Sequence, residues 1–197
     1  EGGALLTDNA GLAKIATSYR DWGRDCWCET GHDNTCGKRF DGEFDHKYTY
    51  SRVGYNLKAT DLQAALGLSQ IAKLDRIIQK RRENWQYLYD GLKDLPILLP
   101  IATPHSNPSW FGFAFGVEKR NELARHLDAH GIGNRPLFAG NIIRQPAYKD
   151  MEYRVVGDLH NSDYAMDSVL WVGCWPGLTK EQLDYIISIL HDYFKKG

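Results

Sequence analysis

The sequence predicts an α/β protein in which a small α+β domain follows a long helix. Two observations lead to this fold class. In the second half of the chain, short strand-like segments alternate with segments that carry apolar residues at helical spacing, and such alternation is typical of layered α/β or α+β structures. Between residues 60 and 92, one apolar stripe continues for longer than a small domain requires.

The composition is that of an ordinary soluble globular protein. The 197 residues are 43% hydrophobic and 25% charged, with a net charge of -1 at pH 7. Without a basic block, we expect no nucleic-acid partner and no anionic membrane surface. No apolar run reaches the roughly 18 residues of a membrane span, and no secretory signal opens the sequence. We therefore expect a cytoplasmic protein, whose four cysteines are more often ligands or buried thiols than disulfides.

The first 23 residues predict a strand and then a helix. Residues 1–8 form the strand, which is entered through glycines. Polar residues at 7–9 can cap the helix, and Gly23 ends it. Its apolar positions recur at helical spacing: Leu12, Ile15, Ala16 and Tyr19. The following region, to about residue 50, lacks a periodic signal, and long ordered loops of this kind are usually functional or metal-held.

A capping box starts each of the two strongest helix patterns. Thr60 and Gln63 start the long helix, which we expect to bridge two domains, and Thr179 and Gln182 start the last one. Between them the sequence predicts, in this order, a strand, a helix closed by a glycine, a strand, a helix and a strand: residues 110–117, 121–130, 132–137, 161–168 and 169–174.

Three cysteines form the most informative motif. Cys26, Cys28 and Cys36 are separated by one and by seven residues. The segment is rich in turn formers: Gly23, Gly31, Asp33, Asn34 and Gly37. Soft thiolates in a loop select zinc or an iron-sulfur cluster over magnesium or calcium. Buried free thiols are one alternative, and a structural zinc site completed by His32 is another; the spacing alone favours zinc over a cluster.

Other candidate residues have plain structural explanations. Asn56 can cap a turn, because Asn tolerates left-handed backbone. Asn141, Arg144 and Gln145 can be loop polars, although a guanidinium suits a bidentate phosphate contact. Cys174 and the aromatic residues at 110–115 are expected in the core. Several histidines are expected at the surface or in the core rather than in catalysis: His46, His105, His126, His130, His160 and His191.

Several segments resemble the pyridoxal-phosphate-dependent sugar aminotransferase family of fold type I, which acts on nucleotide-linked 4-keto sugars. The resemblance lies in residues 1–4 and 19–23, and above all in residues 53–65, VGYNLKATDLQAA. The cysteine loop and the segments 138–146 and 153–157 resemble one branch closely. That branch contains the 3-dehydrases that deoxygenate C3 of CDP-4-keto-6-deoxyglucose in dideoxysugar and lipopolysaccharide O-antigen biosynthesis.

This resemblance implies that the chain is the C-terminal half of a longer enzyme. Residues 1–59 would end the cofactor-binding domain and carry the cysteine loop, residues 60–95 would form the bridging helix, and residues 96–197 the small domain. The histidine that replaces the Schiff-base lysine and the fourth cluster cysteine would precede Glu1. No catalytic residue is therefore expected within this chain, and the chain alone is expected to be inactive.

The resemblance also implies cofactors and partners. The cofactors are pyridoxamine or pyridoxal 5'-phosphate and a [2Fe-2S] cluster held by Cys26, Cys28 and Cys36, so that a cluster is now favoured over zinc. The partners are a nucleotide-linked 4-keto-6-deoxy sugar, a second copy in a homodimer, and an iron-sulfur flavin reductase. Asn56 would reach across the dimer to the cofactor phosphate.

The same resemblance places Asn141, Arg144 and Gln145 near the nucleotide sugar. Two other functions stay open at this point. One is a pyridoxal-phosphate-dependent nucleotide-sugar aminotransferase whose cysteines are incidental, and the other is a zinc-stapled interaction module.

Overall fold

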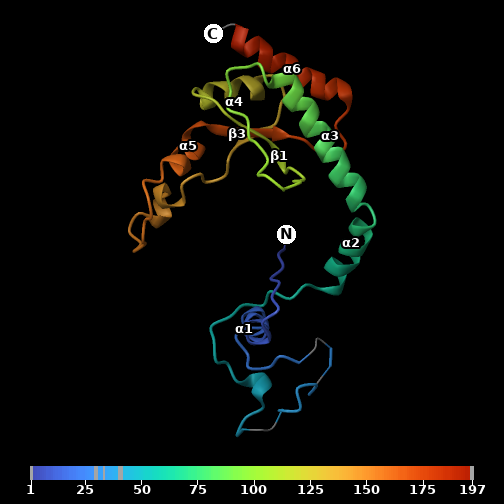
Figure 1. The fold of residues 1–197 in the computed structure, drawn as a ribbon. Helices are drawn as coiled ribbons and strands as arrows, with labels where there is room; N and C mark the ends of the chain where they lie inside the picture. Colours follow the sequence, from blue (N-terminus) through green and yellow to red (C-terminus); the bar gives the residue numbers. More distant parts are fainter. Residues whose placement is uncertain (1, 29–30, 33, 40–41, 196–197) are drawn as a thin grey trace. The chain divides into compact units, whose positions relative to one another are not determined.

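The computed structural model describes residues 2–28, 31–32, 34–39 and 42–195. The chain divides into two compact units, Glu1–Gln70 and Ile71–Gly197, and each is described by itself below. Figure 1 shows the helices and strands in chain order. In the described part of the chain, no helix has the length and apolar character needed to cross a membrane.

Among the described residues of the first unit are two α-helices, which a long, mostly irregular segment joins. Helix α1 spans Ala10–Arg20, as expected, and the side chain of Asn9 caps it by accepting hydrogen bonds from the first backbone amides. The strand expected at residues 1–8 is wrong for the described residues 2–7, which form no regular structure. A strand requires a hydrogen-bonded neighbour, and the described residues form only one sheet, which lies in the second unit.

The segment after the cysteine loop returns to the end of α1. The Tyr55 amide donates to the Tyr19 carbonyl at 2.9 Å. The backbones of Gly23 and Gly54 approach each other so closely that a Cβ atom on Gly54 would collide with the Gly23 nitrogen. Gly23 also has a φ of 85°, and a Cβ atom there would collide with the Arg52 carbonyl. Only glycine fits at these two positions.

The single helix expected over residues 60–95 is two helices. Helix α2 spans Asp61–Ile71, and α3 spans Leu74–Leu92. A turn at residues 72–73 separates them, although neither residue is a glycine or a proline. The physical difference lies in packing: α3 buries Trp85, Leu88 and Leu92, whereas α2 buries none of its residues. The two parts of the apolar stripe therefore do not share one packing surface.

Both predicted capping boxes are confirmed. The Thr60 amide donates to Gln63 Oε1 at 2.8 Å, and the Gln63 amide donates to Thr60 Oγ1 at 3.3 Å. The same reciprocal pair joins Thr179 and Gln182, with distances of 2.9 and 3.3 Å. These bonds satisfy amides at the helix starts that have no partner within the helix.

The second unit is built on a three-stranded antiparallel sheet. Its strands are β1 (Gly112–Gly116), β2 (Asn134–Pro136) and β3 (Val169–Gly173), in the spatial order β1-β3-β2. Each lies within a predicted strand, and each is shorter than predicted. Along β1 and β3 the buried residues alternate with less buried ones, because successive side chains point to opposite faces of a sheet.

Helices α3 and α4 (Arg120–Ala129) pack on the buried face of this sheet, and α6 (Lys180–Lys195) packs against these two helices (Figure 1). Helix α5 (His160–Ser168) leads into β3. The centre of the core is apolar and fully buried: Leu88, Leu92, Phe113, Phe115, Leu123, Leu127, Leu170, Val172 and Leu190. Cys174 is buried in the same cluster, as expected.

Candidate metal centre

Two paired segments bring the first cysteine close to a histidine. Residues 23–25 pair antiparallel with residues 49–51 through backbone hydrogen bonds of 2.9 and 3.0 Å. Cys26 follows the first segment directly, and His46 shortly precedes the second, in the single turn η1 (His46–Tyr48). Because the pairing is antiparallel, the two side chains meet at the same end of it.

The His46 ring is held from two sides. The Asp45 carboxylate caps the turn by accepting the Lys47 amide at 2.9 Å, which fixes the backbone that carries the histidine. The imidazole stacks on the Trp27 ring, with centroids 6.0 Å apart and planes 17° apart. On Trp27, in turn, the Lys14 ammonium of α1 lies 4.6 Å from the ring centre. The ring is therefore ordered by packing as well as by its turn.

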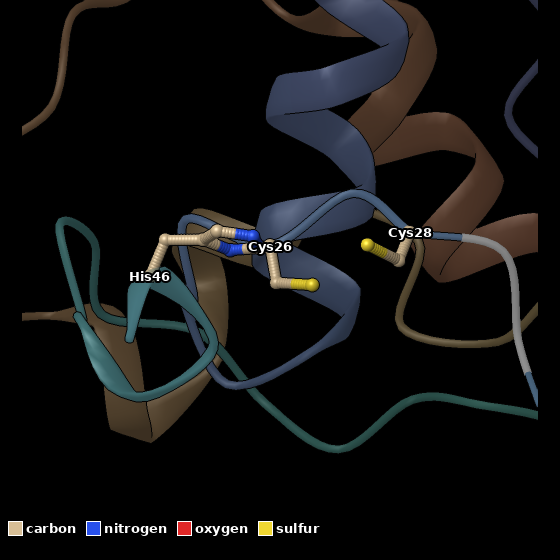
Figure 2. A group of neighbouring side chains, drawn as sticks. All are labelled: Cys26, Cys28 and His46. Carbon is tan, nitrogen blue, oxygen red and sulfur yellow. The ribbon is translucent and has the colours of Figure 1, made fainter. Parts of the chain in front are cut away.

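Three thiols and one imidazole converge at this point. The donor atoms of Cys26, Cys28 and His46 all lie within 4.8 Å of one another. Figure 2 shows the two sulfur atoms turned toward each other and the His46 ring directed at Cys26. Cys36 joins the group, since its Sγ lies 3.4 Å from Cys28 Sγ and 3.0 Å from His46 Nε2. All four cysteines of the chain are free thiols.

The thiols of this group differ in pKa and therefore in protonation state. Burial alone would raise the pKa of Cys28, but hydrogen bonds from the Cys36 amide, from Thr35 and from the two other thiols lower it to about 6. Burial raises the pKa of Cys26, and the neighbouring sulfur charges raise it further. At neutral pH Cys28 is therefore a thiolate beside a protonated Cys26. A bound cation would favour loss of the second proton.

A cavity of about 320 Å³ opens beside the sulfur atoms. Its lining includes four cationic side chains, Arg24, Arg39, Lys47 and Lys58, and two carboxylates, Asp21 and Asp45. Arg39 is paired with Asp45 and Lys58 with Asp21, so the cations exceed the carboxylates by two. The Arg24 guanidinium lies 4.5 Å from the centre of the Trp22 ring, where its charge is stabilised by the aromatic face. These positive charges favour an anionic sulfur or an anionic metal-thiolate centre beside them.

The donor set fits a soft metal. Tetrahedral zinc places two sulfur ligands about 3.7 Å apart, close to the 3.4 Å between Cys28 Sγ and Cys36 Sγ. Thiolates also hold iron-sulfur clusters. The buried Nδ1 atom of His46 has no hydrogen-bond partner among the described residues. The other nitrogen of the same ring, Nε2, contacts the Cys36 sulfur. Both the zinc and the cluster hypotheses are compatible with this chemistry.

His46 lies within the group of sulfur donors, a place that the cysteine spacing does not predict. It was expected to be a surface or core histidine, and His32 was the candidate zinc ligand. His32 lines the same cavity, but among the described residues the close group of donors contains His46 in its place. His46 lies ten residues after Cys36, beyond the short spacings of common zinc motifs. The Asp-His pair at a turn start was the available signal.

Asn56 lies in the first unit, within the segment that returns to α1. Its backbone forms an antiparallel bridge with Asp21, and its side-chain Oδ1 accepts a hydrogen bond from Lys58 Nζ at 2.9 Å. Lys58 also forms an ion pair with Asp21. The exposed Asn56 amide is thus placed beside a lysine, which is a suitable neighbour for a phosphate group.

The other predicted binding residues lie in the second unit and form a network around α5. Asn141, only 4% exposed, donates to Asp163 Oδ1 at 2.7 Å. Arg144, in the short turn η2 (Ile142–Arg144), binds both oxygens of Asp163, at 3.1 and 3.0 Å. Gln145 donates to the Ala139 carbonyl at 3.1 Å. These contacts hold residues 139–145 against α5, and the binding role stays a prediction.

The sulfur-rich loop defines a candidate metal site in the first unit. Residues 1–191 match the model of the DegT/DnrJ/EryC1/StrS aminotransferase family, so the chain belongs to that family. A dTDP-4-dehydro-2,6-dideoxy-D-glucose 3-dehydratase of Saccharopolyspora spinosa is 50% identical over 210 residues, which cover 100% of this chain and 46% of that protein.

Two further similarities point the same way. The lipopolysaccharide biosynthesis protein RfbH of Salmonella typhimurium is 49% identical over 208 residues, covering 98% of this chain and 48% of that protein. The structure of an E. coli GDP-4-keto-6-deoxy-D-mannose-3-dehydratase with bound hydrated PLP is 29% identical, with a TM-score of 0.75, and covers 94% of this chain and 49% of that one. The chain therefore spans about half the length of the curated relatives it matches.

These similarities confirm the expected fold class. The chain has the fold of the C-terminal part of a fold type I pyridoxal-phosphate-dependent enzyme. The three-part division of the chain stays a prediction, because the two compact units of the structure have their boundary near the end of α2.

Proposed function

We propose that this chain is the C-terminal half of a nucleotide-sugar 3-dehydratase, which removes the C3 hydroxyl of a nucleotide-linked 4-keto-6-deoxy sugar. The observation that carries the proposal is the convergence of Cys26, Cys28 and Cys36 in one loop. The chain that carries this loop is 50% identical in sequence to a 3-dehydratase. An ordinary aminotransferase has no need for a cluster of free thiols. The resemblance makes CDP-4-keto-6-deoxyglucose the first substrate to test, in dideoxysugar and lipopolysaccharide biosynthesis.

The cysteine loop would hold a [2Fe-2S] cluster in the assembled enzyme. Pyridoxamine phosphate would supply the amine that condenses with the C4 ketone and the conjugated path for loss of the C3 hydroxyl, and the cluster would supply single electrons. The base and the fourth cluster cysteine would come from the part that precedes Glu1. The role of this chain's loop is to present three thiolates, of which Cys28 is already ionised at neutral pH.

A homodimer would explain an exposed apolar surface in the first unit. Residues 53–57 and the part of helix α2 in this unit carry large apolar side chains that the described chain leaves uncovered: Val53, Tyr55, Leu57, Leu62, Leu66 and Leu68. Val53 is 87% exposed and Leu62 is 84% exposed. Soluble proteins rarely leave such a patch uncovered. We infer that a second copy covers it, and that Asn56, in the middle of the patch, contacts the cofactor phosphate bound by that copy.

The small domain would contribute to substrate binding. Arg144 uses two of its donor groups on Asp163, and a guanidinium has five N–H donors in all. Its side chain is 52% exposed, so it can also contact a nucleotide diphosphate. Asn141 and Gln145 would fix the loop that carries it. An iron-sulfur flavin reductase would supply the electrons, and the cytoplasm would be the place of reaction.

The test uses the full-length protein under anaerobic conditions. Reconstitution should give about two irons and two sulfides per chain, with a broad visible spectrum. Cys28→Ser should abolish reductase-dependent formation of the 3-deoxy product while the initial dehydration persists, measured as exchange of the C3 oxygen with labelled water. Cys174→Ala is the matched control, because that thiol is buried in the core of the other unit and should leave the iron content unchanged.

Two results would overturn the proposal. Tight binding of colourless zinc without iron uptake would identify a structural zinc site. Transfer of an amino group from an amino-acid donor to the sugar, with no loss of the C3 hydroxyl, would identify an aminotransferase.

A further inference from the structure

The contact between His46 and Cys36 has a chemical consequence for any metal held by the loop. His46 Nε2 lies 3.0 Å from Cys36 Sγ, within hydrogen-bonding distance. Once a metal binds, Cys36 is a thiolate and has no proton to donate, so the imidazole must supply the hydrogen of this bond. The tautomer that carries hydrogen on Nε2 leaves a lone pair on Nδ1, which has no partner among the described residues. Nothing on that side of the ring competes with the contact to sulfur.

We propose that His46 is a positioning residue of the metal centre, which donates a hydrogen bond from Nε2 to the Cys36 thiolate and thereby sets the electron density on that sulfur. The proposal rests on the proposed function only for the identity of the metal. The ring is prearranged for this role, because Trp27 stacks on it and Asp45 caps the turn that carries it.

The physical effect is specific. A hydrogen bond withdraws electron density from a metal-bound sulfur, which makes the oxidised centre less stable relative to the reduced one. It therefore raises the reduction potential of a cluster. It also raises the energy of sulfur-to-metal charge transfer, whether the metal is iron or another ion with visible absorption. Loss of the bond should reverse both changes without removing a ligand.

The experiment compares His46→Ala and His46→Gln with the wild type in the full-length protein, each reconstituted with iron and sulfide and, in parallel, loaded with cobalt(II). His46→Ala should keep its full metal content, lower the reduction potential of the cluster and shift the charge-transfer bands to longer wavelength. His46→Gln should restore both properties, because the glutamine amide can place an N–H donor where Nε2 lies. His32→Ala, in the same loop and cavity, is the matched control and should change neither.

Each other outcome contradicts the proposal. Unchanged spectra and potential in His46→Ala would mean that the contact has no electronic effect. Loss of metal in both His46 variants, but not in His32→Ala, would mean that His46 is a ligand itself. A wild type that binds cobalt(II) but forms no cluster would refute the proposed function alone, since the cobalt bands would still test the hydrogen bond.

Discussion

The sulfur atoms of Cys28 and Cys36 lie 3.4 Å apart, although eight positions separate them in the chain. This distance is well beyond the roughly 2 Å of a disulfide, and the pair is instead joined by hydrogen bonding. The Cys36 amide and thiol both help to lower the pKa of Cys28 to about 6, against the opposing effect of burial. Contacts within the loop thus keep the Cys28 sulfur anionic in the metal-free protein. Because the thiolate is the form that binds a metal, we expect Cys28 to be the first ligand.

Cys28 should therefore be the most reactive thiol of the metal-free protein. Because the thiolate is the nucleophile, its alkylation by iodoacetamide should rise with pH through a midpoint of about 6. Mass spectrometry of each cysteine-containing peptide over a pH series measures this. Cys174 is the internal control, because burial raises its pKa and it is fully buried in the folded protein. Labelling of Cys28 only above about pH 8, the range of an ordinary thiol, would contradict the expected shift.

Replacement of Asn56 tests the expected contact across the dimer. In the full-length protein, Asn56→Ala should weaken pyridoxamine phosphate by about 1 to 3 kcal/mol, the range for a hydrogen bond to a charged group. The measurement is a titration of cofactor absorbance. Asn121→Ala, at the exposed start of α4, is the control and should bind normally. An unchanged affinity in Asn56→Ala would reduce its role to the local contact with Lys58.

The network around Asp163 predicts a pH-dependent stability. A hydrogen bond from Arg144, followed by one from Asn141, holds the pKa of Asp163 below its usual range. Because the folded-state pKa is depressed, the stabilisation is present at neutral pH and is lost as the pH falls through that lower value. Asp163→Asn should therefore lower the melting temperature near pH 7, and the difference from wild type should shrink near pH 3.

Asp167→Asn, on the exposed part of the same helix, is the control and should melt like the wild type at both pH values. A constant difference between Asp163→Asn and wild type across the whole pH range would show that the charge of Asp163 is not what stabilises the loop.

The elements that the sequence predicted correctly are those with a local cause. Thr60 and Thr179 start helices because each can exchange hydrogen bonds with a glutamine three residues later, whatever the rest of the chain does. Asn9 acts in the same local way at α1. The strands of the second unit follow from side-chain alternation, which reflects one buried and one less buried face.

The features that the sequence did not predict depend on contacts between distant residues. No glycine or proline marks the break between α2 and α3 in the sequence. The two helices differ in burial, because α3 buries several of its residues and α2 buries none. The place of His46 depends on the pairing of residues 23–25 with residues 49–51. Such pairing is a tertiary event, so cysteine spacing alone pointed to His32 instead.

The last prediction concerns the glycine that allows this pairing. Gly23 and Gly31 both adopt left-handed backbone, with φ of 85° and 82°. An alanine at either position costs about 1 to 2 kcal/mol for that conformation. At Gly31 the added Cβ meets no atom within 4 Å, whereas at Gly23 it collides with the Arg52 carbonyl. The two glycines therefore form a matched pair that separates backbone strain from the steric effect.

Gly23→Ala should pull residues 49–52 away from the start of the cysteine loop, because a backbone carbonyl cannot rotate out of the way as a side chain can. The pairing that holds Cys26 in place would be lost, and the Cys26 sulfur would no longer be kept beside the other donor atoms. We expect Gly23→Ala in the full-length protein to lose most of its metal on reconstitution and to lose more than about 2 kcal/mol of unfolding free energy. Gly31→Ala should keep its metal and lose only the backbone cost. Equal metal content and equal stability in the two variants would contradict the idea that the Gly23 contact assembles the centre.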